Sequence, residues 1–279
     1  MHPFSFRPIQ PSIIDTMKLT IRPPAIWLVL ALAASPHLRA LPEAEATAGR
    51  LIVRRYADAV VVVKLSMILK ISVGDRPPAS SEQKIDLNGT VLSPDGLTVT
   101  SLSAIDPKVL FESVRPQLAP PGIGVDLESS ELKSVRLRLA DATEVPAKVV
   151  WRDAARDLAF LVPDHPLSGG RTFTCVNPGE APEAAMLLGN YYHLSRLPEA
   201  LQRAAIIRPC TITGIIERPR RLLLVSTDYF GDILGCPVFD AQGRVVGICV
   251  RFLVDGSPKG IVVVPSADVT AAAGQMTAL

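Results

Sequence analysis

Residues 87–101, LNGTVLSPDGLTVTS, place Pro94-Asp95-Gly96 between two runs in which apolar residues alternate with polar ones. Proline fixes φ near the value that a turn needs, and glycine supplies the positive φ that closes the turn. Alternation on both sides of such a turn is typical of a β-hairpin. The stretch therefore predicts an antiparallel β-structure, and the many Val, Ile and Pro residues of the chain likewise favour strands and tight turns over helices.

The same pattern recurs along the chain. Val135, Leu137 and Leu139 alternate with Arg136 and Arg138, as in a strand with one solvated face. Further runs predict strands at 59–71, 145–153, 157–163, 184–190, 209–216, 221–228, 236–252 and 259–265. Each half of the chain thus offers about six short strands, the spacing expected of antiparallel barrels or sandwiches.

The remaining segments are assigned by composition. Residues 47–58 are expected to form a short helical lead-in, and Ser266 is expected to cap a closing helix over 267–275. Residues 106–133, which contain Ala119-Pro120-Pro121-Gly122, are expected to be an irregular surface insertion. Two prolines and two glycines within 163–170 predict a domain boundary there.

The N-terminus has the three parts of a secretory signal. Residues 25–34, AIWLVLALAA, are uncharged and apolar, follow Lys18 and Arg22, and precede the polar stretch SPHLRA. Ten residues are too few to cross a bilayer as a helix, which needs about 20. We expect residues 1–40 to be a signal peptide, cleaved near Ala40 or after Ala46, with Met17 as an alternative start. An exported, periplasmic or secreted protein follows, without a membrane span after cleavage.

Charge excludes nucleic acid as the expected partner. Residues 1–40 hold four basic side chains and one acidic side chain, so the remaining chain carries 25 basic and 26 acidic residues. A balance near −1 provides no broad positive field for phosphates. The one dense basic cluster, Arg218, Arg220 and Arg221, is expected to be a solvated hairpin loop.

All four cysteines, Cys175, Cys210, Cys236 and Cys249, lie in the second half. Export would allow one or two disulfides, whereas burial as small apolar residues is an equally good interpretation. Pairing Asp240 with Arg244 across the turn at 241–243 would place Cys236 opposite Ile248, which disfavours a Cys236–Cys249 bridge. The spacing matches no metal-binding motif, and neither a metal nor another cofactor is expected.

Specific motifs carry a resemblance beyond this pattern. Residues 87–100 resemble the first-barrel hairpin G-S-G-V-I-I-S-x-D-G-x-I-L-T of HtrA/DegP-type trypsin-like serine proteases. Residues 139–161 resemble the family's L-A-D-G…A-K-V-V…D…D-L-A-L-L strands. In the second half, 188–190, 227–228, 237–248 and 260–265 resemble the I-G-N-P segment, the T-D before the nucleophile, the following hairpin and the last strand.

The resemblance implies an all-β fold of two six-stranded antiparallel β-barrels with a short C-terminal helix. The barrels would span 47–165 and 166–279, and the family's active site would lie between them. It also implies an HtrA-type trimer. Only fourteen residues follow Pro265, so the family's PDZ module is not expected.

The family's catalytic positions are altered in this sequence. A serine protease needs a histidine to take the proton from the serine and an aspartate to orient the histidine. The family's T-N-x-H reads Thr100-Ser101-Leu102-Ser103, so the base position is Ser103, while the orienting carboxylate is retained as Asp157. The nucleophile position, counted back from Pro237, is Leu234, or Ile233 with one insertion. The oxyanion hole, which depends on a glycine-rich turn, is altered as well.

Loss of these groups favours a pseudoprotease. Relocated catalysis would need Cys236 and His193, but packing of Cys236 under the loop, with His193 on a surface loop, is the expected arrangement. The leading hypothesis is binding of a peptide or an envelope protein in the inter-barrel cleft, with Ile233, Leu234, Gly235 and Cys236 as candidate contacts. Ile233 and Leu234 would either fill the catalytic pocket or present an apolar anchor. The alternatives are a regulatory or scaffold partner of an active homologous protease and, more weakly, an unconventional serine-type or cysteine-type endopeptidase.

Overall fold

The structure is a computed structural model that describes residues 43–118, 122–180, 185–226, 233–254 and 257–276. The expected signal peptide, residues 1–40, and the candidate cleavage site near Ala40 lie outside the described residues, whereas the alternative site after Ala46 lies within α1 (Glu43–Tyr56). In the part of the chain that is described, no helix is long and apolar enough to span a membrane.

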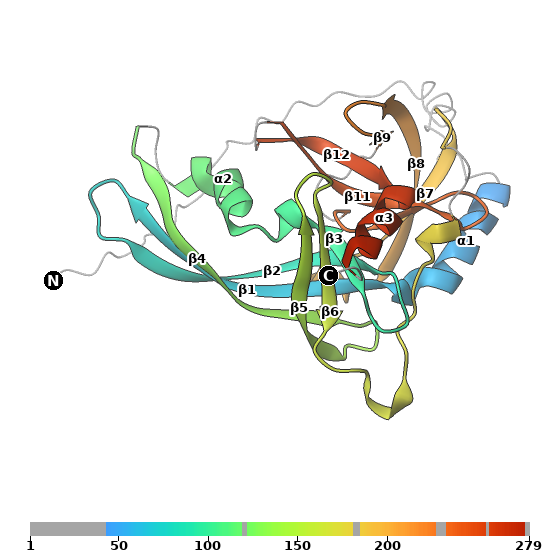
Figure 1. Cartoon of the computed structure of the whole chain (residues 1–279), viewed down its shortest axis with the longest axis horizontal. Coiled ribbons are helices and arrows are strands. Elements are labelled where there is room, and N and C mark those ends of the chain that lie inside the picture. Colours follow the sequence, from blue (N-terminus) through green and yellow to red (C-terminus); the bar gives the residue numbers. More distant parts are fainter. Residues whose placement is uncertain (1–42, 119–121, 181–184, 227–232, 255–256, 277–279) are drawn as a thin grey trace, which may run out of the picture. The chain divides into compact units, whose positions relative to one another are not determined.

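Two closed six-stranded antiparallel barrels form the described chain (Figure 1). The first has the strand order β1-β2-β3-β6-β5-β4 and the second β10-β11-β12-β9-β8-β7. This confirms the expected fold class. The strands of the first barrel are β1 (Val60–Val73), β2 (Ala79–Val91), β3 (Thr98–Ser101), β4 (Val125–Arg138), β5 (Glu144–Asp153) and β6 (Leu158–Pro163). Those of the second are β7 (Asn190–Arg196), β8 (Ala205–Ile216), β9 (Leu222–Ser226), β10 (Pro237–Phe239), β11 (Val245–Val254) and β12 (Ser257–Pro265).

The hairpin at 87–101 is confirmed. The N–H of Gly96 donates to the carbonyl of Ser93 at 3.0 Å, and the N–H of Leu92 donates to the carbonyl of Leu97 at 2.7 Å. Gly96 has φ +91°, and a Cβ there would lie 2.6 Å from the Phe173 ring. The turn therefore needs glycine both for its backbone conformation and for space.

Three helices accompany the barrels: α1 (Glu43–Tyr56), α2 (Pro107–Leu118) and α3 (Ser266–Met276). The lead-in and closing helices are confirmed. Ala48, Ile52 and Tyr56 of α1 pack with Phe239 and Leu194, so this lead-in helix covers the second barrel although it precedes the first in sequence.

The expectation of an irregular insertion over 106–133 is wrong. Its first half is α2, where Pro107 opens the helix and the Asp106 carboxylate accepts the N–H groups of Lys108 and Val109 at 2.8 and 3.2 Å. An aspartate before a proline at the first helical position is a helix start signal. Its second half is most of β4, whose many polar residues hid the strand periodicity.

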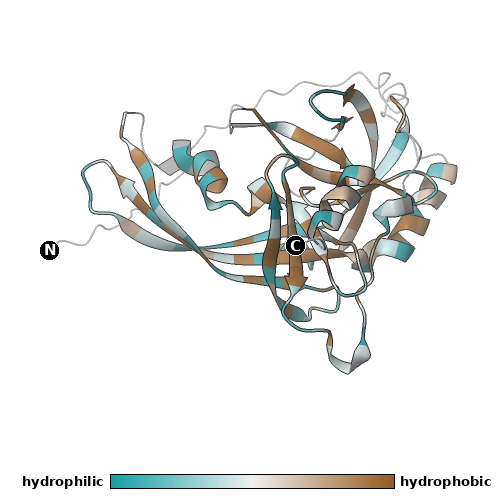
Figure 2. Ribbon diagram, in the orientation of Figure 1, coloured by the Kyte–Doolittle hydropathy of each residue, from teal (hydrophilic) through white to brown (hydrophobic). Residues whose placement is uncertain are grey.

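β1, β2 and β4 continue past the closed part of the first barrel as a three-stranded sheet. β2 pairs with β3 only at Thr90 and Val91, and β4 pairs with β5 only from Val135 to Arg138, whereas β1 pairs with both neighbours as far as Ile71. Figure 2 shows hydrophobic and hydrophilic residues interleaved along these long strands. One face of the sheet carries Leu65, Met67 and Leu69, which belong to the core.

Candidate functional site

The carboxylate of Asp157 lies where the two barrels meet. The side chain is buried, with 7% exposed, and the residue stands just before β6 with φ +55°. The left-handed region is uncommon outside glycine, but aspartate tolerates it better than most residues. The Asp157 carbonyl also accepts the N–H of Leu102 at 2.9 Å, which ties this residue to η2 (Leu102–Ala104).

Four donors surround this carboxylate. The N–H of Ser103 donates to Oδ1 at 2.7 Å, and the hydroxyl of Ser103 donates to Oδ2 at 3.0 Å. The hydroxyl of Ser101 also donates to Oδ2, and the N–H of Arg251, from β11 of the second barrel, donates to it at 3.0 Å. Ser103, the residue expected at the family's base position, is thus 2% exposed and bound to the aspartate.

Burial raises the pKa of Asp157 above its usual value, and the hydrogen bonds from Ser101, Ser103 and Arg251 oppose that rise. The donors supply what water would otherwise supply to a carboxyl group. Hydroxyl groups cannot take up and return a proton near neutral pH as an imidazole does. Asp157 therefore acts as a structural acceptor that connects β3, η2 and β11.

The second segment expected at the site is the turn at residues 233–236. The N–H of Cys236 donates to the carbonyl of Ile233 at 3.0 Å, and Gly235 has φ +79°. The N–H of Gly235 donates to the carbonyl of Cys249 at 2.8 Å, and the carbonyl of Gly235 accepts the Thr90 hydroxyl at 2.6 Å. The N–H groups of Gly235 and Cys236 are consequently engaged inside the protein rather than directed at a substrate oxygen.

Gly235 also fixes how closely the barrels approach. A Cβ at this position would lie 2.2 Å from the carbonyl oxygen of Asn88 and 2.6 Å from the Thr100 hydroxyl. The contact with Asn88 cannot be relieved by rotating a side chain, because its carbonyl oxygen belongs to the backbone. Only glycine fits this contact between the second barrel and β2.

The four candidate peptide contacts are interior. Ile233, Leu234 and Cys236 belong to the buried core of the second barrel, which also includes Ala104 from η2. Of the two alternatives for Ile233 and Leu234, the structure has them filling the space between the barrels. As arranged, these side chains present no apolar anchor to solvent, which corrects the expectation that they line an open cleft.

The residues considered for relocated catalysis are also buried. His193 lies in β7, opposite Val238 of β10, with 3% exposed and no hydrogen-bond partner for Nε2, so its expected place on a surface loop is wrong. Burial, with a contribution from the charge of Arg208, lowers the pKa of His193 to about 4. The imidazole is therefore neutral near pH 7 and sealed from solvent.

In the structure, Cys175, Cys210, Cys236 and Cys249, all within the described residues, form no disulfide bond. Burial raises the pKa of Cys210 to about 12 and that of Cys249 further, so both thiols stay protonated. Cys236 lies opposite Cys249, not Ile248, because a register shift between Val238 and Phe239 moves the pairing by one residue. The sequence argument against a Cys236–Cys249 bridge assumed a regular hairpin and was wrong on this register.

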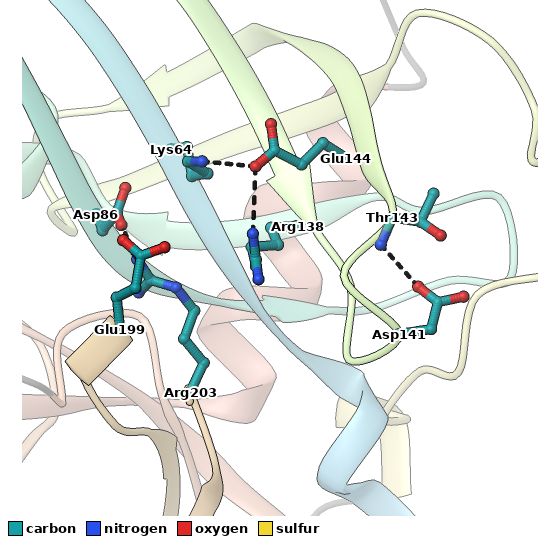
Figure 3. A network of polar contacts seen from close by, with 8 residues as sticks. All are labelled: Lys64, Asp86, Arg138, Asp141, Thr143, Glu144, Glu199 and Arg203. Atoms are coloured by element: carbon teal, nitrogen blue, oxygen red, sulfur yellow. Dashed lines mark hydrogen bonds and ion pairs between the residues drawn. The ribbon is translucent and has the colours of Figure 1, made fainter. Parts of the chain in front are cut away.

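Beside the turn, a groove of about 240 Å³ lies between the barrels. Its lining comes from β1 and β2 on one side and from the β7–β8 connection on the other: Val62, Asp86, Leu87, Asn88, Arg196, Leu197, Pro198, Glu199 and Arg203. Arg203 pairs with Asp86 of the first barrel and with Glu199 of its own loop, as Figure 3 shows. Lys64, Arg138 and Glu144 form a separate ionic group on the first barrel.

Arg196 lines this groove and connects the second barrel to the first. Its guanidinium donates to the carbonyl of Ala57 at 2.6 Å and to that of Val60 at 2.9 Å, while its N–H donates to the Asn88 side chain at 3.0 Å. One arginine of the second barrel therefore joins the start of β1 to β2. Sequence reasoning missed Arg196, Asn88 and Ser101. Only Ser101 had a local signal, its place two residues before Ser103.

Within the described ranges, no three His, Cys, Asp or Glu side chains are grouped so that they could hold a metal ion.

Residues 88–248, more than half of the chain, match the family model described as a trypsin-like peptidase domain. The chain belongs to the trypsin-like peptidase family.

No curated protein matches the sequence. Among solved structures, the apo form of the MamO protease domain from Magnetospirillum magneticum is similar, with 16% identity over 78% of this chain and 96% of that chain, and a TM-score of 0.47. A likeness of this size says nothing about activity.

Proposed function

We propose that this chain is an exported, non-catalytic trypsin-like domain of the HtrA/DegP-like type, which binds a peptide or protein segment between its barrels without cleaving it. The observation that carries the proposal is the state of Asp157. Its carboxylate is saturated by Ser101, Ser103 and Arg251 at the place where the family's histidine would stand. A triad whose base and nucleophile are replaced together retains little of the family's chemistry.

The positions expected for the nucleophile carry no reactive group. Leu234 and Ile233 have no atom that can attack a carbonyl, and both are packed in the core. Cys236 is fully buried and His193 is neutral with 3% exposed, so neither meets a substrate. A serine-type or cysteine-type hydrolase would need a group that the described part of this junction does not expose.

Binding is assigned to the groove beside the turn. Leu87 and Val62 give it apolar surface from the first barrel, and Leu197 and Pro198 give it apolar surface from the second. Asp86, Glu199 and Arg203 provide charges of both signs at its rim. A groove that combines apolar surface with charges of both signs suits an extended peptide that places one apolar side chain between the barrels.

Three assays on the purified mature protein test the absence of catalysis. Folded protein should react with neither a fluorophosphonate serine probe nor a thiol-directed probe, and it should not cleave casein. Ser103→His should remain inactive, because the nucleophile is still missing. Turnover by the wild type or by this single variant would overturn the proposal.

Binding is tested with a peptide library on the immobilised protein. Leu197→Arg, which adds a charge inside the groove, should abolish peptide retention. Leu201→Arg is the matched control, because Leu201 belongs to the same loop, lies outside the groove lining and is 57% exposed. Equal retention by both variants would place binding elsewhere. Retention of no peptide, with a stable complex with an active protease instead, would favour the regulatory alternative.

A further inference from the structure

The three-stranded extension of the first barrel leaves two strand edges without a partner among the described residues. β1 is its central strand, so β2 before Thr90 and β4 before Val135 each pair on one side only. A strand edge exposes unpaired N–H and C=O groups and is a template for another strand. Proteins protect such edges by charge, by covering them, or by pairing them.

The β2 edge is complementary to itself. In an antiparallel pair of two β2 strands centred on Gln83, Glu82 of each copy lies opposite Lys84 of the other. Directly opposed side chains of opposite charge stabilise an antiparallel pair. Glu82, Gln83 and Lys84 are exposed; the Glu82 carboxylate accepts the Ser66 hydroxyl at 2.7 Å, and among the described contacts Lys84 has no ion-pair partner within its own chain.

The β4 edge lacks this property. Between Val125 and Ser134 it carries three acidic side chains and one basic side chain, Lys133, which already pairs with Glu131 at 3.0 Å. The register that would oppose Glu131 to Lys133 of a second copy centres on Leu132 and cannot extend beyond Ser134, because residues 135–138 are paired with β5. The excess of negative charge makes β4 an edge that repels its own kind.

We propose that the β2 edge is a dimer interface, and that its occupant is β2 of a second copy of this chain. The two extensions would join into one six-stranded sheet with the order β4-β1-β2-β2-β1-β4. The interface is isologous, because each copy contributes the same residues to both sides of a two-fold axis at Gln83. It involves neither Asp157 nor the turn at 233–236, although the pairing reaches Asp86 and Leu87 of the groove lining, so the dimer is tested by sedimentation without added peptide.

Charge reversal tests the pairing through the monomer–dimer equilibrium, measured by sedimentation of the full mature chain. By symmetry, Glu82→Lys creates two like-charge pairs across the interface, and Lys84→Glu does the same. Each single variant should weaken dimerisation about tenfold or more. The double variant Glu82→Lys/Lys84→Glu restores both pairs and should dimerise within about threefold of the wild type.

Cross-linking tests the register. Gln83→Cys, in a Cys175→Ser background, places the new thiols directly opposite each other, and mild oxidation with copper phenanthroline should link the two copies. Ser81→Cys is the matched control. Residue 81 of one copy would lie opposite Ile85 of the other, so the two thiols would be four residues, roughly 13 Å, apart and should not link.

Each outcome bears on the interface directly. A wild type that is monomeric or trimeric at high protein concentration would overturn it, as would a dimer that ignores both single reversals. Linking by Ser81→Cys rather than Gln83→Cys would show a different register and equally overturn the pairing centred on Gln83. Pairing of the edge with a foreign peptide would appear as charge-sensitive peptide binding by a monomer.

Discussion

Two sides of the inter-barrel junction fill their space by opposite means. On the first-barrel side, the Asp157 carboxylate is held by hydroxyl and backbone donors from Ser101, Ser103 and Arg251. On the second-barrel side, Ile233 and Leu234 are packed among apolar neighbours, and the backbone of Gly235 is bonded within the protein. Both sides lie at positions that the family resemblance assigns to the catalytic groups.

The difference shows that a site can be closed in two ways. A buried carboxylate is tolerated only while its hydrogen-bond donors remain, because any buried donor or acceptor that is left without a partner costs free energy. An apolar filling depends instead on area removed from water and on close packing. The polar side should therefore be intolerant of losing one group, whereas the apolar side should lose stability in proportion to the volume removed.

The largest expected effect is at Asp157. Asp157→Ala leaves the donors of Ser101, Ser103 and Arg251 without their acceptor and places alanine at φ +55°, so the free energy of unfolding should fall by about 4 kcal/mol. Urea denaturation measures the loss. Asp157→Asn keeps one acceptor and the backbone preference, and should cost about half as much. A loss below about 1 kcal/mol for the alanine variant would contradict the structural role of this carboxylate.

The next effect is a pH dependence that has opposite signs on the two sides. The pKa of His193 is lowered from 6.5 to about 4, so the unfolded chain takes up a proton that the folded protein refuses as the pH falls from 6.5. Stability should fall by up to about 3 kcal/mol between pH 6.5 and 4. The raised pKa of Asp157 acts the other way, because its contribution to stability is lost as the pH rises from 3.8 through the pKa of the folded state.

Denaturation at a series of pH values separates these contributions. His193→Gln should remove most of the decline in acid, and Asp157→Asn should not. A decline that survives in His193→Gln would mean that another group controls the acid sensitivity. The comparison of the two variants thus assigns each part of the pH dependence of stability to His193 or to Asp157.

The smallest effect tests whether Leu234 is core or anchor. Leu234→Ala should lower the free energy of unfolding by about 2 kcal/mol, at the low end for a buried leucine because the residue is at the margin of the core. Leu234→Met, which keeps the volume, should cost less than about 1 kcal/mol. Unchanged stability combined with lost peptide retention would mean instead that Leu234 meets a ligand, and the two sides would then differ in function as well as in packing.

The sequence alone determined the strand-rich fold, its central hairpin and the residue types at the positions that the resemblance assigns to catalysis. Pro94-Asp95-Gly96 closes a turn by its own dihedral preferences, and a serine at 103 cannot become a base in any environment. The motifs distributed from residue 87 to 265 gave both barrels, because local periodicity and turn residues repeat in each half.

Only the tertiary structure decided what fills the junction. Ser101, Asn88, Arg196 and Arg251 act through contacts between segments more than fifty residues apart, and no local pattern records such contacts. α2 and the greater part of β4 were hidden by polar residues, and a single register shift after Val238 reversed the expected partner of Cys236. Burial of Ile233 and Leu234 depends on the approach of the barrels at Gly235, a distance that side-chain types do not encode singly.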